Sequence, residues 1–259
     1  MAFNYITFQT EDRLAFITLN RPDKRNALNF DFITELKEAM TRAENDNQAK
    51  IIILKAEGEA FSAGADLEYL KKLQENSYEE NLMDSTHMME LFKLIYTHPK
   101  LVIAQVEGPA IAGGCGLATV CDLSFATPDS VFGYSEVKIG FIPAIVMIFL
   151  IRKIGEAKAK EMLLTGKIVK AEEAKALGMI NFVEKSSTIN AAVIQYAQDL
   201  CETASSESLA RTKKMIAEVQ NKTIIDALEY ATVMNAKARD TKDCKKGIEA
   251  FLNKEDLKW

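Results

Sequence analysis

The chain is poor in the residues that bind metals or form disulfides. Its 259 residues include only two histidines, His87 and His98, and four cysteines. The cysteines form no CxxC pair, so the sequence predicts neither a metal site nor a disulfide framework. Cys115 and Cys121 fit best as small buried apolar residues. We therefore expect a reducing, cytoplasmic setting.

The chain also lacks a strong charge of one sign and a long hydrophobic run. Its 32 Lys and Arg against 37 Asp and Glu give a net charge of −5, which argues against a nucleic-acid partner. The longest apolar run, Ala144–Ile151, is too short to cross a membrane, so no membrane partner is expected. It predicts a buried helix with Pro143 at the first helical position. Met1–Tyr5 shows no signal-peptide pattern.

What the chain does have is a core-forming composition and a regular alternation of elements. With 48% hydrophobic residues it suits one large domain, or a core with an appended subdomain. Apolar runs predict strands at 5–10, 14–19, 51–55, 101–106, 122–126 and 179–183, the first two forming a hairpin. Helical spacing predicts helices after Asn29, which serves as cap, and at 66–73, 85–96 and near 171–178. We expect an α/β fold with mainly parallel pairing.

Two further stretches complete this outline. Residues 74–85 are polar and acidic, which favours a mobile loop. Beyond about Ile189 the pattern is helical only, at 189–203, 206–220, 224–239 and 243–253. Such a helical block suits packing on the core or on another subunit.

The segment Gly108–Ala118 is the most informative part of the sequence. The strand at 101–106 leads into it, and Cys115–Val120 has the character of a buried helix. Gly113 and Gly114 stand at the joint, where a missing Cβ allows a ligand to approach the main chain. Unpaired N–H groups at a helix start attract an anion, or an oxygen that becomes one during reaction. The alternative is a tight strand-to-helix turn with no ligand.

Several motifs together resemble the crotonase (enoyl-CoA hydratase/isomerase) superfamily. The three strongest are residues 61–67, 108–118 and 132–140. Residues 21–29, 164–166, 171–174 and 177–178 look like the same family, in the same order and at its spacing. The resemblance implies a spiral core of ββα units over residues 1–190. It also implies a C-terminal helical trimerisation region over residues 191–259, giving a homotrimer or a dimer of trimers.

The resemblance also implies an acyl-CoA thioester as substrate, with no separate cofactor because CoA is part of the substrate. Matched residue by residue, the main-chain N–H groups of Ala65 and Gly113 hold the thioester oxygen. The matched substrate-binding positions are Lys24, Arg25, Ala27, Ala63, Asp66, Leu67, Gly114 and Gly116. For Lys24 and Arg25, a solvated surface position is an equal alternative. Phe251 and Lys254 match a C-terminal helix that reaches a neighbouring subunit's CoA.

Glu136 is the candidate acid and base. Its sequence neighbours Phe132, Val137, Ile139 and Phe141 are apolar, and burial among them is expected to raise its pKa. A surface carboxylate is the alternative. Two-glutamate hydratases of this family carry a second Glu where this chain has Gly116, and they are richer in glycine where it has 144–147.

With one glutamate, several reactions stay open. Glu136 alone could shuttle a proton between Cγ and Cα, as in Δ3-Δ2 enoyl-CoA isomerisation. Water could instead be activated by a carboxylate on the substrate, or by Asp84 or His87. Residues 135–144 and 114–117 look most like bacterial methylglutaconyl-CoA hydratases, which favours a hydratase, with an isomerase next. A non-catalytic CoA-ester binder and a thioester hydrolase or decarboxylase are further alternatives. Met88, Met89 and Phe92 could line the acyl pocket or form plain core.

Overall fold

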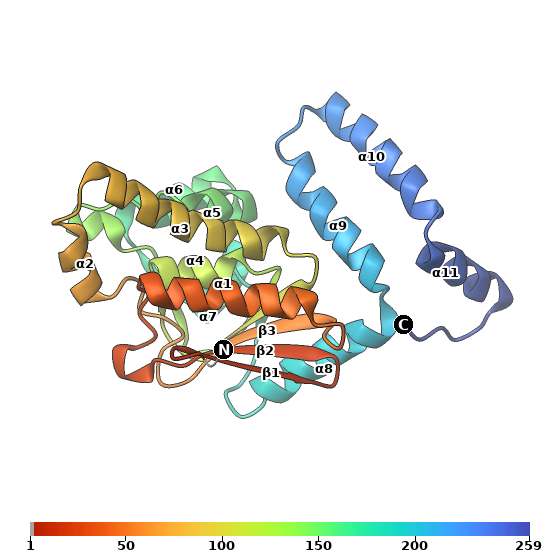
Figure 1. Ribbon diagram of the computed structural model, residues 1–259, viewed down its shortest axis with the longest axis horizontal. Coiled ribbons are helices and arrows are strands. Elements are labelled where there is room, and N and C mark those ends of the chain that lie inside the picture. The colour runs from red at the N-terminus through yellow and green to blue at the C-terminus, as the bar shows by residue number, and fades with distance from the viewer. Residues whose placement is uncertain (1–2) are drawn as a thin grey trace.

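A six-stranded sheet forms the centre of the fold in a computed structural model, which describes residues 3–259 (Figure 1). The interpretation that Met1–Tyr5 has no signal-peptide pattern rested partly on Met1 and Ala2, which lie outside the described residues. The strand order is β1 (Ile6–Glu11), β2 (Leu14–Leu19), β3 (Ile51–Ala56), β4 (Leu101–Val106), β6 (Leu123–Ala126) and β9 (Phe182–Val183). Only the β1–β2 hairpin is antiparallel. The predicted α/β fold with mainly parallel pairing is confirmed.

Helices bury both faces of this sheet. On one face pack α1 (Phe30–Asn45), α3 (Tyr78–Thr97) and α4 (Gly113–Val120), and on the other α8 (Ile189–Thr203). Alternate residues of β3 therefore enter different cores, Ile52 with α1 and Ile53 with α8. Asn29 caps α1 as predicted, because its side chain accepts a hydrogen bond from the Phe32 N–H at 2.8 Å.

A second, smaller sheet positions the loops that carry the family motifs. It contains β5 (Ala110–Ile111), β7 (Val131–Gly133) and β8 (Ile168–Lys170). Of the shorter helices, α7 (Ala171–Leu177) packs on β7 and β8. The others are α2 (Leu67–Leu73), α5 (Val146–Ile154), α6 (Glu156–Thr165) and the 3-10 helices η1 (Pro22–Lys24) and η2 (Glu136–Ile139). Two- and three-residue strands leave too short an alternation to detect, so the sequence did not predict this sheet.

Several predicted boundaries were wrong, and the strand predicted at 179–183 is only Phe182–Val183. Residues 74–85 were expected as a loop, but α3 begins at Tyr78. Ser77 accepts a hydrogen bond from the Glu80 N–H, and the Glu80 side chain accepts one from the Ser77 N–H. This capping box starts a helix within a polar stretch. The helix expected from Ala144 begins at Val146 instead, so Pro143 precedes the helix.

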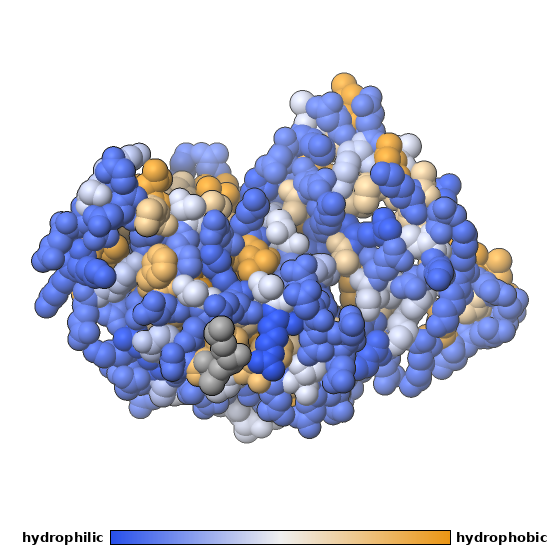
Figure 2. All heavy atoms as spheres, in the orientation of Figure 1, coloured by the Kyte–Doolittle hydropathy of each residue, from blue (hydrophilic) through white to orange (hydrophobic). Residues whose placement is uncertain are grey.

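The last three helices form an arm that projects from the body of the molecule (Figure 1). They are α9 (Ser206–Val219), α10 (Ile224–Arg239) and α11 (Lys242–Asn253), close to the predicted bounds. None of the residues of α10 is buried. Figure 2 shows hydrophobic residues at the surface of the arm, and large apolar side chains of α10 and α11 are more than half exposed. Among residues 3–259, no helix is long and apolar enough to span a membrane.

Candidate active site

Two glycine-containing turns lie side by side at the centre of the candidate site. The Ser62 N–H donates to the Pro109 carbonyl at 3.2 Å, and the Ile111 N–H donates to the Ser62 carbonyl at 3.0 Å. A Cβ placed on Gly64 would lie only 3.6 Å from the Gly113 nitrogen. The segments 62–66 and 109–113, which are far apart in the sequence, therefore form one unit.

The N–H of Ala65 has no hydrogen-bond partner among residues 3–259. Leu28 pairs with the residues on both sides, because its N–H donates to the Gly64 carbonyl at 2.7 Å and its carbonyl accepts from the Asp66 N–H at 2.9 Å. In such a ladder the intervening N–H points away from the paired strand. The Ala65 N–H thus remains available for a ligand.

The N–H of Gly113 is also unpaired within the described chain. The Ala112 N–H donates to the Gly133 carbonyl at 2.7 Å, and the next helical bond runs from the Gly116 N–H to the Ala112 carbonyl at 3.0 Å. Ala112 has a φ of 50°, a strained value for a residue with a Cβ. This bend starts α4 at Gly113, and the helix dipole adds positive charge at its amide.

Close packing and an ion pair hold the two turns rigidly. A Cβ on Gly114 would lie 2.4 Å from the Ser62 carbonyl oxygen, so only glycine allows this contact. The Ser62 hydroxyl donates to the Asn26 carbonyl at 2.8 Å. Arg21 pairs with the 4%-exposed Asp66 at 2.7 Å, directly after Ala65. The turn that carries the Ala65 N–H is therefore anchored to the loop at 21–26.

Opposing effects set the ionisation of Asp66. Burial alone would raise the pKa of its carboxyl. Hydrogen bonds from the N–H groups of Tyr69 and Glu68 lower this pKa, and the Arg21 guanidinium lowers it further, so that the pKa lies below its usual value. Its Oδ2 accepts no well-aligned hydrogen bond, yet the Arg21 guanidinium neutralises its charge. Asp66 therefore stays ionised and caps α2.

Glu136 is the buried carboxylate without such compensation. It begins η2, is 8% exposed, and its Oε2 has no hydrogen-bond partner in the described part of the chain. Burial raises the pKa of Glu136, as the sequence predicted, although a hydrogen bond to its main chain opposes the rise. Its sequence neighbours Ile139 and Phe141 are exposed. The β5–β7 pairing attaches this segment to the residues just before Gly113.

Gly116 is completely enclosed. A Cβ at this position would lie 2.3 Å from Val146 Cγ1 and 3.0 Å from Phe92 Cε1. The position at which the family resemblance implies a second glutamate in two-glutamate hydratases is therefore covered by two apolar side chains, both buried.

The other predicted binding positions differ in exposure. Lys24, Arg25, Ala63 and Leu67 are exposed, whereas Ala27 is 7% exposed. Lys24 forms an ion pair with Glu68 at 3.0 Å, which raises the pKa of Lys24. Ala63 lies in the first of the two turns and Leu67 begins α2, whereas Lys24, Arg25 and Ala27 lie in and just after η1.

Asp84 and His87 are held by neighbouring helices. Asp84 accepts a hydrogen bond from the Tyr69 hydroxyl, linking α3 to α2. His87 stacks on Phe30 with ring centroids 4.0 Å apart, and its Nε2 lies 3.0 Å from the Thr34 hydroxyl. Burial lowers the pKa of His87. Both side chains thus join helices.

The remaining candidates separate into core and surface. Phe92 is fully buried, Met88 packs partly against the same core, and Met89 is 40% exposed. Cys115 and Cys121 are buried, as predicted, and burial raises the pKa of each thiol to about 12. On the arm, Phe251 is 82% exposed and Lys254 ends α11 in a left-handed conformation.

Sequence reasoning missed Arg21, Ser62 and Val146. Arg21 and Ser62 lie inside motifs that were recognised, but their roles come from contacts across the fold. For Val146 the sequence offered one signal: two-glutamate hydratases are richer in glycine where this chain has residues 144–147.

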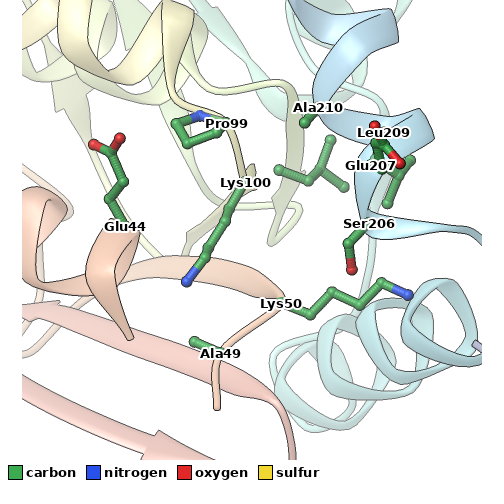
Figure 3. A pocket seen from close by; sticks show the side chains of 10 residues that line it. Glu44, Ala49, Lys50, Pro99, Lys100, Ser206, Glu207, Leu209 and Ala210 are labelled. Atoms are coloured by element: carbon green, nitrogen blue, oxygen red, sulfur yellow. The ribbon is translucent and has the colours of Figure 1, made fainter. Parts of the chain in front are cut away.

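Two cavities lie away from these residues, beside α9. One of about 300 Å³ is lined by Lys50, Lys100 and Ser206 among others (Figure 3), and one of about 430 Å³ by Asp122, Lys153 and Lys213 among others. Neither contains a predicted site residue. Within residues 3–259, no group of three or more His, Cys, Asp or Glu could hold a metal ion.

Comparison with known proteins shows the family of the chain. Residues 9–259 match the family described as Enoyl-CoA hydratase/isomerase. A Thermus thermophilus protein named as a candidate enoyl-CoA hydratase is 40% identical, with 93% of this chain and 95% of that protein covered. The Crotonyl-CoA hydratase of Syntrophomonas wolfei is 32% identical, with 98% and 97% covered.

Solved structures show the same fold. An enoyl-CoA hydratase structure from Shewanella pealeana gives a TM-score of 0.93 at 28% identity, covering 99% of this chain and 96% of that one. An enoyl-CoA hydratase structure from Mycobacterium smegmatis gives a TM-score of 0.92 at 29% identity, covering 99% of each chain. The predicted crotonase-type α/β fold is confirmed.

Proposed function

The chain is an enzyme of the enoyl-CoA hydratase/isomerase family, and on that basis we propose that it hydrates short, branched or carboxylated enoyl-CoA thioesters, such as methylglutaconyl-CoA. The observation that supports the reaction most is Glu136, a buried carboxylate with one unpaired oxygen. A buried carboxylate without a partner costs stability, and ionisable groups of this kind are concentrated at functional sites.

In the proposed mechanism, the N–H groups of Ala65 and Gly113 hold the thioester oxygen. Polarising this carbonyl makes the β-carbon electrophilic and the α-carbon acidic, because negative charge collects on the oxygen as an enolate. Two donors fixed in advance stabilise this charge without rearrangement, and losing one such donor typically costs about 10²–10³ in rate. Their unpaired state in the free chain supports this role.

Glu136 moves the protons. As a carboxylate it accepts a proton from water while the water oxygen bonds to Cβ and the π electrons pass into the enolate. The protonated Glu136 then donates a proton to Cα, which restores both the thioester and the carboxylate. A pKa raised toward neutrality suits a group that must accept and donate in turn.

The CoA portion belongs to the substrate, so the proposal includes no separate cofactor. Lys24, Arg25, Ala27, Ala63 and Leu67 contact the CoA portion. Asp66, Gly114 and Gly116 shape the site, Asp66 through its ion pair with Arg21 and the glycines through close packing.

Δ3-Δ2 enoyl-CoA isomerisation is the second candidate, and the enclosed Gly116 favours it. One carboxylate is enough for this reaction, because Glu136 takes a proton from Cα and returns it at Cγ. A non-catalytic CoA-ester binder would use the two amides alone.

Three substrates distinguish these functions: crotonyl-CoA, 3-methylglutaconyl-CoA and a 3-enoyl-CoA. Hydration removes the absorbance of the conjugated enoyl thioester, whereas isomerisation of the 3-enoyl substrate creates it. The proposal expects loss of absorbance with at least one of the first two. A gain of absorbance with the 3-enoyl substrate alone would assign the isomerase instead. Tight binding without a change of absorbance for any substrate would assign a binder.

The proposal also includes assembly as a homotrimer or a dimer of trimers in the cytoplasm. The exposed apolar side chains of the arm, Ile225 and Leu228 on α10 and Phe251 on α11 among them, support assembly. The four free cysteines suit a reducing setting.

A further inference from the structure

We propose that Val146, backed by Phe92, is the residue that determines whether this site works with one carboxylate or two. The inference rests on the proposed function and refines it. The absence of a glutamate at Gly116 is one change in the sequence, but the structure shows that the space for such a side chain is also gone.

The packing around Gly116 leaves no room for any side chain. A Cβ there would lie 2.3 Å from Val146 Cγ1 and 2.9 Å from Val146 Cβ, distances that real Cβ atoms essentially never show. Val146 is 4% exposed and Phe92 is fully buried. Phe92 also stacks against Phe149, with centroids 5.8 Å apart, which holds its ring in place beside Gly116.

This apolar wall lies close to the proposed oxyanion site. Gly116 follows Gly113 by three residues in α4, so the two positions share one face of the helix. An acyl group whose oxygen is bound at Gly113 would meet the Glu136 carboxylate from η2 and a hydrocarbon wall from α5 and α3. Only Glu136 is then left to exchange protons with the acyl group.

Restoring a second carboxylate should therefore require two changes. The variants Gly116→Glu, Val146→Gly and Gly116→Glu/Val146→Gly are compared with the unaltered chain for hydration of crotonyl-CoA. We expect the double variant to hydrate at least ~10-fold faster than Val146→Gly, because a positioned acid or base contributes about 10²–10⁴. Gly116→Glu alone should be no faster than the unaltered chain. A gain from Gly116→Glu alone, or none from the double variant, would overturn the proposal.

A thermal measurement tests the packing without relying on activity. Gly116→Ala is introduced into the unaltered chain, into Val146→Gly and, as a control, into Val169→Gly, which removes another buried valine. At fixed protein concentration, we expect a Tm loss of roughly 2–10 °C in the unaltered and control backgrounds, because overpacking is destabilising. A smaller loss is expected with Val146→Gly, because only the Phe92 contact at 3.0 Å then remains. Equal losses in all three backgrounds would contradict the proposal.

The two measurements separate this inference from the proposed function. If the unaltered chain converts none of the enoyl-CoA substrates, the proposed function fails, whatever the Tm values. If it is active and the Tm loss does not depend on Val146, the role of Val146 fails while the enzyme assignment stands.

Discussion

At the scale of single residues, Glu136 shows how burial raises reactivity and lowers stability together. Its pKa is raised because the surrounding protein solvates the carboxylate less well than water does. Asp66 is also buried, but Arg21 and two main-chain N–H groups stabilise its charge, so its pKa falls. The site thus contains one carboxylate for structure and one for reaction.

Glu136→Gln should therefore slow turnover strongly and stabilise the protein at neutral pH. A group with a raised folded pKa favours the folded state at acid pH, and this contribution is lost as the pH rises from 4.5 through the folded pKa. Gln removes this loss, so the Tm difference between variant and parent should grow with pH over that window. The rate should fall about 10²–10⁴-fold, with binding of a CoA ester retained. A variant that keeps its activity would contradict the assignment.

The activity of the unaltered enzyme should depend on the same titration. If Glu136 acts first as a base, kcat/KM should fall toward acid pH with an apparent pKa above 4.5, the ordinary value. A rate profile that is flat through this region would argue against Glu136 as the base.

His98 should make the fold sensitive to acid. It is 1% exposed, and its Nδ1 accepts from the Lys100 N–H at 3.0 Å. Burial, and then the charge of Lys213, lower its pKa to about 4 from 6.5. As the pH falls, His98 binds a proton in the unfolded chain at a higher pH than in the folded chain. The unfolding free energy should therefore fall by roughly 3 kcal/mol as the pH goes from 6.5 to 4. Denaturation curves measured at several pH values give the unfolding free energy as a function of pH. This free energy should depend less on pH in His98→Gln, whereas the control His87→Gln should keep most of the dependence.

Local motifs and their family resemblance predicted Ala65, Gly113 and Glu136 as site residues, and the structure leaves both amides unpaired and buries Glu136. The sequence did not identify the apolar wall at Gly116, because Val146 and Phe92 come from two other helices. Their contact depends on how α3, α4 and α5 pack, and no local pattern encodes that packing.

At the scale of elements, four lysines stabilise the ends of helices. Each donates to main-chain carbonyls at a helix C-terminus, where the last carbonyls lack partners and the dipole is negative. These are Lys50 at α8, Lys100 at α1, Lys153 at α4 and Lys213 at α3. Lys50 and Lys100 also line the cavity in Figure 3.

Lys213 holds the arm to the body of the molecule. From α9, its ammonium binds the Ile95 carbonyl at 3.1 Å and the Asp122 carboxylate at 2.6 Å. Lys213→Met should leave the half-buried Asp122 with the Val102 N–H but without its charged partner, lowering the unfolding free energy by about 2 kcal/mol. The neighbouring Lys214→Met is a matched control, because Lys214 is 65% exposed, and should change it by less than about 0.5 kcal/mol. Equal effects in urea denaturation would contradict this role.

Long periodic elements were predicted well and short ones were not. The four C-terminal helices keep an apolar spacing over 12 residues or more, which fixes their bounds closely. The stretch at 74–85 was misread because its polarity outweighed the Ser77 and Glu80 capping pair.

At the scale of the whole molecule, the arm exposes more large apolar side chains than is usual for a monomeric protein. The side chains of Ile224, Ile225 and Leu228 are each more than 60% exposed near the start of α10. We expect light scattering to give three or six times the mass of one chain. Ile225→Glu should shift the mass toward the monomer if this surface forms the contact, whereas the exposed Glu229→Gln should not. A monomeric parent would contradict the proposed assembly.

The central claim is that two unpaired amides bind the thioester oxygen beside one buried carboxylate. A crystal structure of Glu136→Gln with a bound enoyl-CoA tests it most directly. We predict a thioester oxygen within about 3 Å of both the Ala65 and Gly113 nitrogens, with the residue 136 side chain against Cα. A thioester oxygen bound elsewhere, with either amide left unpaired, would contradict the account.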